Sequence, residues 1–177
     1  MKTIKLYIAA SLDGYIARSN GDLDWLLKFP TPTGTEYGYK ELMDSIDTII
    51  MGGKTYRAVL DMNFEWPYSD KTCYIISRHN TNLTPTKDVK FITENVVEKI
   101  EELKQQDGKD IWLVGGGEII SMLLEAGLVD KLQICYIPVI LGKGIRLFPE
   151  QPQESTWKLV GSKSYDSGII KVDYVIR

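Results

Sequence analysis

The most informative stretch of the sequence is IWLVGGGEII, residues 111–120. Its first four residues are apolar and typical of a buried strand, and after three glycines the apolar residues resume with helical spacing. The glycines permit a tight turn and let a ligand approach the backbone without a Cβ in the way. The following helix would direct its free N–H groups at that turn, which suits a pyrophosphate. The glycines do not have the GxGxxG spacing, so a plain strand-to-helix turn is the alternative.

Two further expected strand ends carry residues suited to a phosphate. IIMGGKTY, residues 49–56, again turns on glycines, with Lys54 as a cation and Thr55 as a helix-capping hydroxyl. It lacks the GxxxxGK[ST] spacing of a P-loop, so a surface lysine at a helix start is an equal alternative. YIISR, residues 74–78, ends in a hydroxyl and a guanidinium. Since ligands of open α/β sheets bind at the carboxyl ends of parallel strands, the three ends together predict a site for a dinucleotide or a phosphorylated ligand.

Apolar runs with strand character alternate with segments of helical spacing along the chain. We expect strands over residues 4–10, 48–51, 72–77, 89–93, 111–114 and 132–139, and helices over residues 37–47, 96–107 and 119–126, with a short helix after the glycines of residues 52–53. Residues 157–165 and 169–176 fit an antiparallel hairpin. This order predicts an α/β fold in one domain, residues 1–177, with a mostly parallel sheet and an antiparallel edge.

The composition excludes several classes of protein. The 177 residues include 21 Lys+Arg against 24 Asp+Glu, and this net charge of −3 argues against nucleic acid as a main partner. His79 is the one histidine of the sequence, so we expect neither a zinc site nor a Ser–His–Asp triad and predict no metal. Cys73 and Cys135 are isolated and form no disulfide framework.

No stretch of the sequence is typical of a membrane span or of a cleaved leader. The sequence contains no run of about 20 apolar residues. The short apolar run near the N-terminus is followed by Asp13 and a polar stretch, unlike a signal peptide. We therefore expect a cytoplasmic protein without a membrane partner.

Three acidic residues near the expected elements require separate interpretation. Asp13 follows the first strand, Asp24 precedes Trp25, and Glu36 precedes the helix expected from residue 37. For each carboxylate, a role in stabilising a turn, capping a helix or compensating a dipole is a simpler interpretation than catalysis. Trp25 and Tyr37 would wall a flat apolar pocket, although core packing explains them equally well.

Four motifs, taken together and in this order, resemble the dihydrofolate reductase fold. They are IAASLDGYIA (residues 8–17), MGGKTY (51–56), VGGG (114–117) and PVILGKG (138–144). The SLDG and PxxLG elements are more similar to the reductase domain of the bifunctional riboflavin-biosynthesis deaminase/reductase and its stand-alone relatives. The resemblance implies a three-layer fold, with helices on both faces of the central sheet and a C-terminal hairpin that completes it.

The resemblance also implies a cofactor, NADPH, and hydride transfer to a C=N or C=O bond of a small heterocycle or an opened sugar. Ala9, Ala10 and Ile16 would flank the nicotinamide. The residues at the three strand ends would bind the phosphates and the adenosine ribose of the cofactor. They are Gly52, Gly53, Lys54, Thr55, Ser77, Arg78, Val114, Gly115, Gly116, Gly117, Glu118 and Ile119. Many relatives carry arginine at the position of Gly53, so Lys54 and Arg78 would have to hold the 2′-phosphate.

The reaction implied by the resemblance needs a proton donor, or a water held by one. Asp13, at the nicotinamide end, is the preferred catalytic candidate. Glu36 is the second, because it falls near the position of the pocket acid of dihydrofolate reductases. Trp25 and Tyr37 would contact the substrate. A homodimer is expected from the family and from the apolar strand over residues 132–141.

The sequence leaves several functions open. The pyrimidine reductase of riboflavin synthesis, dihydrofolate reductase and a reductase of another small heterocycle all fit the motifs. A non-catalytic nucleotide-binding protein that retained the fold is an alternative of a different class. Deamination is not expected, because the HxE and PCxxC motifs of the zinc-dependent deaminase half are absent from the sequence.

Overall fold

Strands and helices alternate along the chain, as the sequence predicts. The computed structural model describes residues 1–62, 65–78, 88–149 and 154–177. Its strands are β1 (Ile4–Ser11), β2 (Tyr15–Ala17), β3 (Ile46–Gly52), β4 (Thr72–Ile76), β5 (Val89–Ile92), β6 (Asp110–Gly115), β7 (Lys131–Ile137), β8 (Ile145–Arg146), β9 (Trp157–Ser164) and β10 (Ile170–Ile176). Its helices are α1 (Asp24–Leu27), α2 (Tyr39–Ser45), α3 (Gly53–Asp61), α4 (Val96–Gln105) and α5 (Gly117–Glu125).

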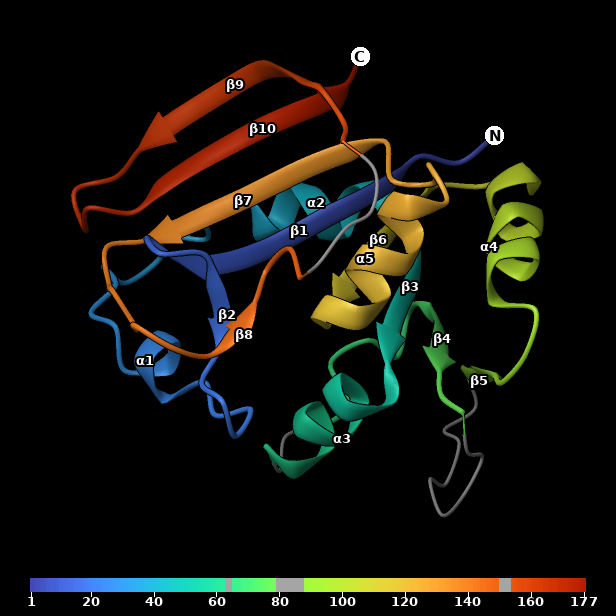
Figure 1. The fold of residues 1–177 in the computed structure, drawn as a ribbon, viewed down its shortest axis with the longest axis horizontal. Helices are drawn as coiled ribbons and strands as arrows, with labels where there is room; N and C mark the ends of the chain where they lie inside the picture. The colour runs from blue at the N-terminus through green and yellow to red at the C-terminus, as the bar shows by residue number, and fades with distance from the viewer. Residues whose placement is uncertain (63–64, 79–87, 150–153) are drawn as a thin grey trace.

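The central sheet has eight strands in the order β5-β4-β3-β6-β1-β7-β10-β9 (Figure 1). The first six of these run parallel, and the C-terminal hairpin β9–β10 joins β7 antiparallel. The predicted mostly parallel sheet and terminal hairpin are therefore confirmed. A small second sheet pairs β2 with β8, so that the loop after β1 is fixed to the segment that follows β7.

Helices cover both faces of the sheet, which gives the predicted three layers. On one face α4 and α5 contribute buried Ile100, Ile120 and Leu123 to a core that they share with the strands of the sheet. On the other face Leu42 of α2 and Tyr56 of α3 belong to a second buried cluster. Because alternate residues of a strand point to opposite faces, Leu6 and Ala10 of β1 lie in the first core, whereas Tyr7 and Ala9 face α1 and α2.

Helix α2 begins at Tyr39, two residues later than predicted, for a backbone reason. Tyr37 and Gly38 have φ of 50° and 89°, in the left-handed region, so neither belongs to a right-handed helix. The C-terminal boundary also differs: α2 ends at Ser45, and residues 46–47 belong to β3 rather than to a helix. Helix α5 begins earlier than predicted, at Gly117, directly after the glycine turn.

The position of β7 overturns one argument about assembly. This strand lies inside the sheet, where Leu132 pairs with Leu6 of β1 on one side and with Tyr174 of β10 on the other. Its apolar residues are therefore explained by burial between neighbouring strands of the same chain. The apolar residues of β7 therefore give no support to a homodimer, which stays a prediction.

Candidate cofactor and substrate site

Two glycine turns meet at the carboxyl ends of β3 and β6. A Cβ added to Gly52 would lie 3.2 Å from Ile119 Cγ1 and 3.8 Å from the carbonyl oxygen of Gly115. Gly115 has φ of +117°, which side chains of L-residues rarely allow, and its peptide bond to Gly116 is cis. The structure thus brings together the two glycine motifs that were separated by about sixty positions in the sequence, as expected for adjacent parallel strands.

Each of these turns leads into the N-terminus of a helix. Gly52 precedes α3 and Gly116 precedes α5, both in extended conformation, and neither helix has a side-chain cap. The first amides of such helices lack intrahelical acceptors, and the positive end of the helix dipole adds to them. A Cβ on Gly116 would stand 3.6 Å from Thr55 Oγ1, so a side chain would begin to fill the space between the two turns.

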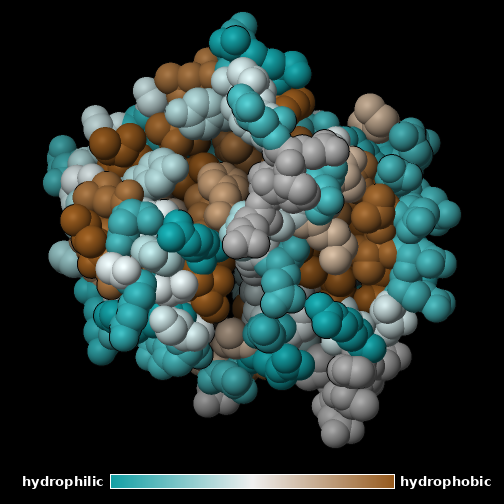
Figure 2. Space-filling model, in the orientation of Figure 1, coloured by the Kyte–Doolittle hydropathy of each residue, from teal (hydrophilic) through white to brown (hydrophobic). Residues whose placement is uncertain are grey.

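Three charged side chains converge beside these turns. The carboxylate of Glu118, in the first turn of α5, lies 3.6 Å from Lys54 Nζ and 4.0 Å from the Arg78 guanidinium. All three side chains are largely exposed, with 74–89% of their surface accessible. Figure 2 shows hydrophilic residues over the α3 end of this face. Ser77 is close to the same place, because a Cβ on Gly53 would lie 3.1 Å from its Oγ.

The residues predicted to flank the nicotinamide lie on different faces. Ala10 is fully buried in the core under α4 and α5, so only its backbone can approach a ligand. Ile16, on β2, packs against that same core. Ala9 is half-buried on the opposite face of β1, where Trp25 and Tyr37 also lie. The predicted substrate residues therefore share one apolar cluster with Ala9.

This cluster contains residues that the sequence analysis did not select. The Tyr7 hydroxyl donates to the carbonyl oxygen of Tyr37 at 3.3 Å, and Cys135 Sγ lies 4.0 Å from that hydroxyl. The Tyr37 ring meets the Tyr165 ring edge-on, 4.7 Å between centroids. The period-two alternation along β1, which places Tyr7 beside Ala9, was the signal that could have identified Tyr7.

Burial shapes the chemistry of this cluster. Desolvation raises the pKa of the Tyr7 hydroxyl far above its ordinary value, with a smaller contribution from Cys135. The pKa of the Cys135 thiol is raised for the same reason. Both groups are therefore neutral at physiological pH. Trp25 is 6% exposed, and its indole N–H has no hydrogen-bond partner within the described part of the chain.

Asp13 holds a loop in place. Its carboxylate accepts a hydrogen bond from Ser11 Oγ and two more from the backbone N–H groups of Leu141 (3.1 Å) and Gly142 (2.7 Å). The Ser11 bond is the largest cause that lowers the pKa of Asp13, and the two backbone bonds lower it further. The side chain thus ties the turn after β1 to the turn after β7. A carboxylate with a lowered pKa orients donors and waters better than it donates a proton.

Glu36 lies in the loop before α2, where its side chain is exposed and its carbonyl oxygen accepts the Tyr39 N–H at 2.8 Å. This is a backbone contact in the turn before α2, so the role of the Glu36 carboxylate stays a prediction. Glu36 also belongs to the lining of a groove between α2 and the C-terminal hairpin. Among the described residues, no contact joins the Glu36 carboxylate to Asp13.

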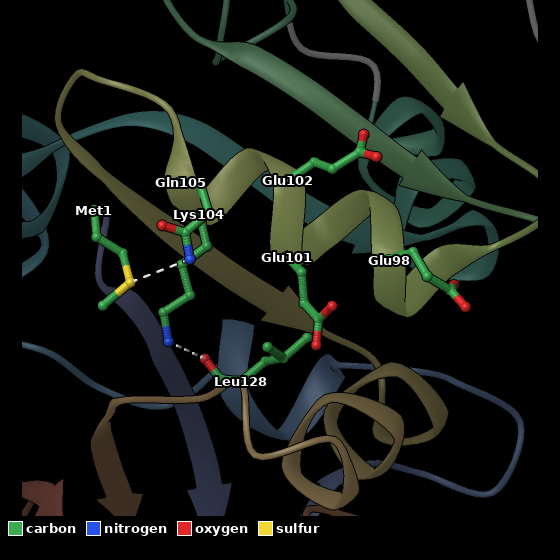
Figure 3. A pocket seen from close by; sticks show the side chains of 7 residues that line it. All are labelled: Met1, Glu98, Glu101, Glu102, Lys104, Gln105 and Leu128. Carbon is green, nitrogen blue, oxygen red and sulfur yellow. Dashed lines mark hydrogen bonds between the residues drawn. The ribbon is translucent and has the colours of Figure 1, made fainter.

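A second hollow lies at the opposite end of the sheet, next to α4. Figure 3 shows Glu98, Glu101 and Glu102 on this helix, with Lys104 donating to the carbonyl oxygen of Leu128 at 3.1 Å. Lys104 also pairs with Asp130 at 2.7 Å, so its charge is already compensated. None of the predicted site residues lines this hollow.

The described part of the chain contains neither a cluster of metal ligands nor a helix that could cross a membrane. Residues 1–62, 65–78, 88–149 and 154–177 contain no group of three or more His, Cys, Asp or Glu side chains that could hold a metal ion. Within the same ranges, no helix has the length and apolar character needed to cross a bilayer. His79 lies outside the described residues.

The sequence of the chain matches a known protein family. The family model of the RibD C-terminal domain matches residues 2–171, nearly the whole chain. The chain belongs to the RibD C-terminal domain family. Two relatives in Bacillus subtilis (strain 168) support this assignment. YwjB is 37% identical over 168 residues, covering 95% of this chain and 94% of YwjB, and YyaP is 31% identical over 185 residues, covering 98% and 94%.

Solved structures confirm the dihydrofolate reductase-like fold of this RibD-type chain. A Shewanella sp. PV-4 protein named for riboflavin biosynthesis superposes with a TM-score of 0.87 at 30% identity, over 99% of both chains. The deaminase/5-amino-6-(5-phosphoribosylamino)uracil reductase of Thermotoga maritima gives 0.73 at 18% identity, over 99% of this chain and 57% of that one. Enterococcus faecalis dihydrofolate reductase, complexed with NADP(H), gives 0.68 at 19% identity, over 99% and 96%.

Proposed function

We propose that the chain is an NADPH-dependent reductase that transfers a hydride to a small heterocyclic substrate of the pyrimidine or pterin kind. One observation carries the proposal. Two helix N-termini opened by glycines and two cations, Lys54 and Arg78, converge at the carboxyl ends of β3, β4 and β6. Three solved structures with the same fold are named as reductases or as reductase-like, which supports the proposal.

The residues present fit a dinucleotide. The uncapped amides of α3 and α5 suit a pyrophosphate, and the glycine at position 116 leaves the space next to Thr55 Oγ1 open to a ligand. Lys54 and Arg78 would hold the 2′-phosphate, since together they outnumber the single carboxylate of Glu118. When bound, NADPH supplies the hydride, and the chain supplies binding, orientation and exclusion of water.

The apolar cluster around Ala9 would hold the substrate ring. Trp25 and Tyr37 form two of its walls, and the indole N–H of Trp25 is buried with no hydrogen-bond partner in the described part of the chain. Asp13 and Glu36 stay the proposed acids. Because the carboxylate of Asp13 is held ionised by three donors, it would act by orienting a water, whereas exposed Glu36 would have to reach the ring through a movement of its loop.

Binding of the cofactor tests the proposal directly. NADPH fluorescence should change on titration with the protein, with a dissociation constant on the order of micromolar. Arg78→Ala should weaken NADPH by about fivefold and NADH by less, because NADH has no 2′-phosphate. Lys99→Ala, a loss of the same charge on α4, is the matched control. Absence of binding for both dinucleotides would overturn the proposal.

Turnover separates the possible substrates. Oxidation of NADPH is measured with dihydrofolate and with the ribosylamino-pyrimidinedione of riboflavin synthesis, and then with a panel of related heterocycles. The engagement of Asp13 by three donors favours one alternative, a nucleotide-binding protein without catalysis. Tight binding of NADPH without oxidation across the panel would support that alternative.

We also propose that the protein forms a homodimer in the cytoplasm, through the outer edge of the sheet. Strand β9 lies at that edge and exposes Leu159 (51%) and Val160 (56%). Pairing of two such edges would join their unpaired backbone groups and place these apolar side chains beside those of the other copy. Sedimentation at micromolar concentration should give the mass of a dimer, and Val160→Lys should shift it to the mass of a monomer.

A further inference from the structure

The side chain of Arg57 reaches back along α3 to the space beside Gly53. A Cβ added to Gly53 would lie 3.8 Å from Arg57 Nη1 and 3.1 Å from Ser77 Oγ. Gly53 and Arg57 are four positions apart in α3, so they share one face of the helix. Side chains of a helix also tilt towards its N-terminus, which carries a long arginine side chain over the preceding turn. The guanidinium therefore borders the space that a side chain at position 53 would enter.

The burial of Tyr56 fixes the direction in which this face of α3 points. Tyr56 is fully buried, and its ring meets the rings of Trp66 and Phe91 edge-on, with 5.4 and 6.1 Å between centroids. Successive residues of a helix are about 100° apart, so Arg57 projects from a neighbouring side of α3, which is exposed. Rotation of the helix about its axis would bring the Tyr56 ring out of the core. The Arg57 side chain is therefore kept on the side of α3 that faces Ser77.

The charge of Arg57 is not compensated by a carboxylate in the described part of the chain. Lys54 and Arg78 both approach Glu118, at 3.6 and 4.0 Å, whereas Arg57 forms no ion pair with any described residue. Even Asp61, one turn further along α3, is not its partner. The three cations therefore exceed the one carboxylate by two positive charges. A phosphate monoester carries nearly two negative charges at neutral pH, so the region matches such a group.

Arg57 can bind a phosphate without losing an existing contact. Lys54 and Arg78 would have to share a phosphate with Glu118, which weakens their contribution. The planar guanidinium of Arg57 presents paired donors that match two phosphate oxygens, and Ser77 Oγ lies on the other side of the same space. The first turn of α3 adds the positive end of a helix dipole.

We propose that Arg57 is a third cation for the 2′-phosphate of NADPH, and the residue on which the preference for NADPH over NADH depends most. This assignment rests on the proposed function in naming NADPH as the ligand. The recognition of a phosphate monoester on an adenosine ribose does not depend on hydride transfer. It can therefore be measured with ligands that have no nicotinamide.

Calorimetric titration with 2′,5′-ADP and 5′-AMP isolates the contribution of the 2′-phosphate, because the two ligands differ only in that group. Arg57→Gln should weaken 2′,5′-ADP by about tenfold, the value of one charge-assisted hydrogen bond, and leave 5′-AMP unchanged. Arg57→Lys keeps the charge without the paired donors, and its affinity for 2′,5′-ADP should fall between those of the wild type and Arg57→Gln. The matched control is Arg177→Gln, the same loss of charge beyond β10, where the preceding N–H of Ile176 bonds to Asp130 at the opposite end of the sheet.

The outcomes separate this inference from the proposed function. Absence of 2′,5′-ADP binding by the wild type, equal binding by the Arg57→Gln protein, or an equal loss for 2′,5′-ADP and 5′-AMP would each overturn the role of Arg57. NADPH binding and oxidation that Arg57→Gln leaves unchanged would remove this role and leave the reductase standing. Binding of 2′,5′-ADP that depends on Arg57, in a protein that oxidises NADPH with no substrate of the panel, would support the phosphate site and remove the reductase.

Discussion

The Glu118 carboxylate lies 3.6 Å from the ammonium nitrogen of Lys54, at the point where the sheet meets the first turn of α5. The Arg78 guanidinium approaches the same carboxylate at 4.0 Å. Under the proposed function, Glu118 would compete with the 2′-phosphate of NADPH for both cations. The contribution of Lys54 and Arg78 to the proposed selectivity for NADPH over NADH would then depend on how far the two cations outweigh the one carboxylate.

Replacement of this anion should sharpen the preference for NADPH. Glu118→Gln keeps the shape of the side chain and removes its charge, and we expect NADPH to bind about two- to fivefold more tightly, as for exposed charge pairs, with NADH nearly unchanged. Glu125→Gln, at the other end of the same helix, is the matched control. The gain should shrink in high salt. Equal gains for both dinucleotides would show that Glu118 does not face the 2′-phosphate.

Two buried tryptophans offer a matched test of an unpaired donor. Trp25 and Trp112 are 6% and 5% exposed. The Trp112 indole donates to the carbonyl oxygen of Tyr7 at 3.0 Å, whereas the Trp25 indole has no partner among the residues that the structure describes. Trp112→Phe leaves that carbonyl without its donor, whereas Trp25→Phe removes a donor that has no described partner. Urea unfolding should show that Trp112→Phe lowers the free energy of unfolding by about 1–2 kcal/mol more than Trp25→Phe does. The same Trp25→Phe protein should show weaker substrate binding, measured as a higher KM.

The clamp made by Asp13 should appear as a pH-dependent stability. Hydrogen bonds, first from Ser11 and then from Leu141 and Gly142, lower the pKa of Asp13 in the folded state. Its contribution is therefore present above the unfolded pKa of about 3.9 and is lost as the pH falls through the lower folded value. Asp13→Asn should lower Tm at pH 7, and the difference from wild type should narrow below about pH 4. Glu102→Gln, an exposed carboxylate of α4, should leave Tm unchanged at both pH values.

The two thiols should be inert in the folded protein. Burial raises the pKa of Cys73 to about 12, and it also raises the pKa of Cys135, so little thiolate exists at pH 8. Both side chains are at most 5% exposed. Reaction with Ellman's reagent at pH 8 should be slow in buffer, and both thiols should react promptly in guanidinium chloride. Fast labelling of either thiol in the native protein would contradict this picture.

Most of the sheet was predictable because its strands are apolar runs ended by glycine or polar residues. The strands from β1 to the hairpin β9–β10 agree with the expected ranges to within two residues at each end. The β2–β8 pair was not predicted, since strands of three and two residues carry no periodic signal. The start of α2 was also misplaced, because the left-handed conformation of Tyr37 is set by its packing rather than by its residue type.

The candidate site was partly predictable for a similar reason. Glycine turns at strand ends are visible in a sequence, and the parallel sheet brings them together without further information. The environment of Asp13 was not visible, because two of its three donors lie beyond β7, far along the chain. The hydrogen bond from Gln133 to Asp173 likewise depends on the register of β7 and β10, which no local pattern of the sequence specifies.

The central place of β1 has a consequence for how the chain is made. This strand is the first to be synthesised, yet its partners are β6, where Ile4 pairs with Ile111, and β7, where Lys5 pairs with Lys131. At a ribosomal rate of about 5–20 residues per second, β1 waits on the order of 5–20 s for its neighbours. During that interval its apolar face is open to the solvent and to chaperones. The strand that organises the finished sheet is thus the segment with the longest exposure to misassembly in the growing chain.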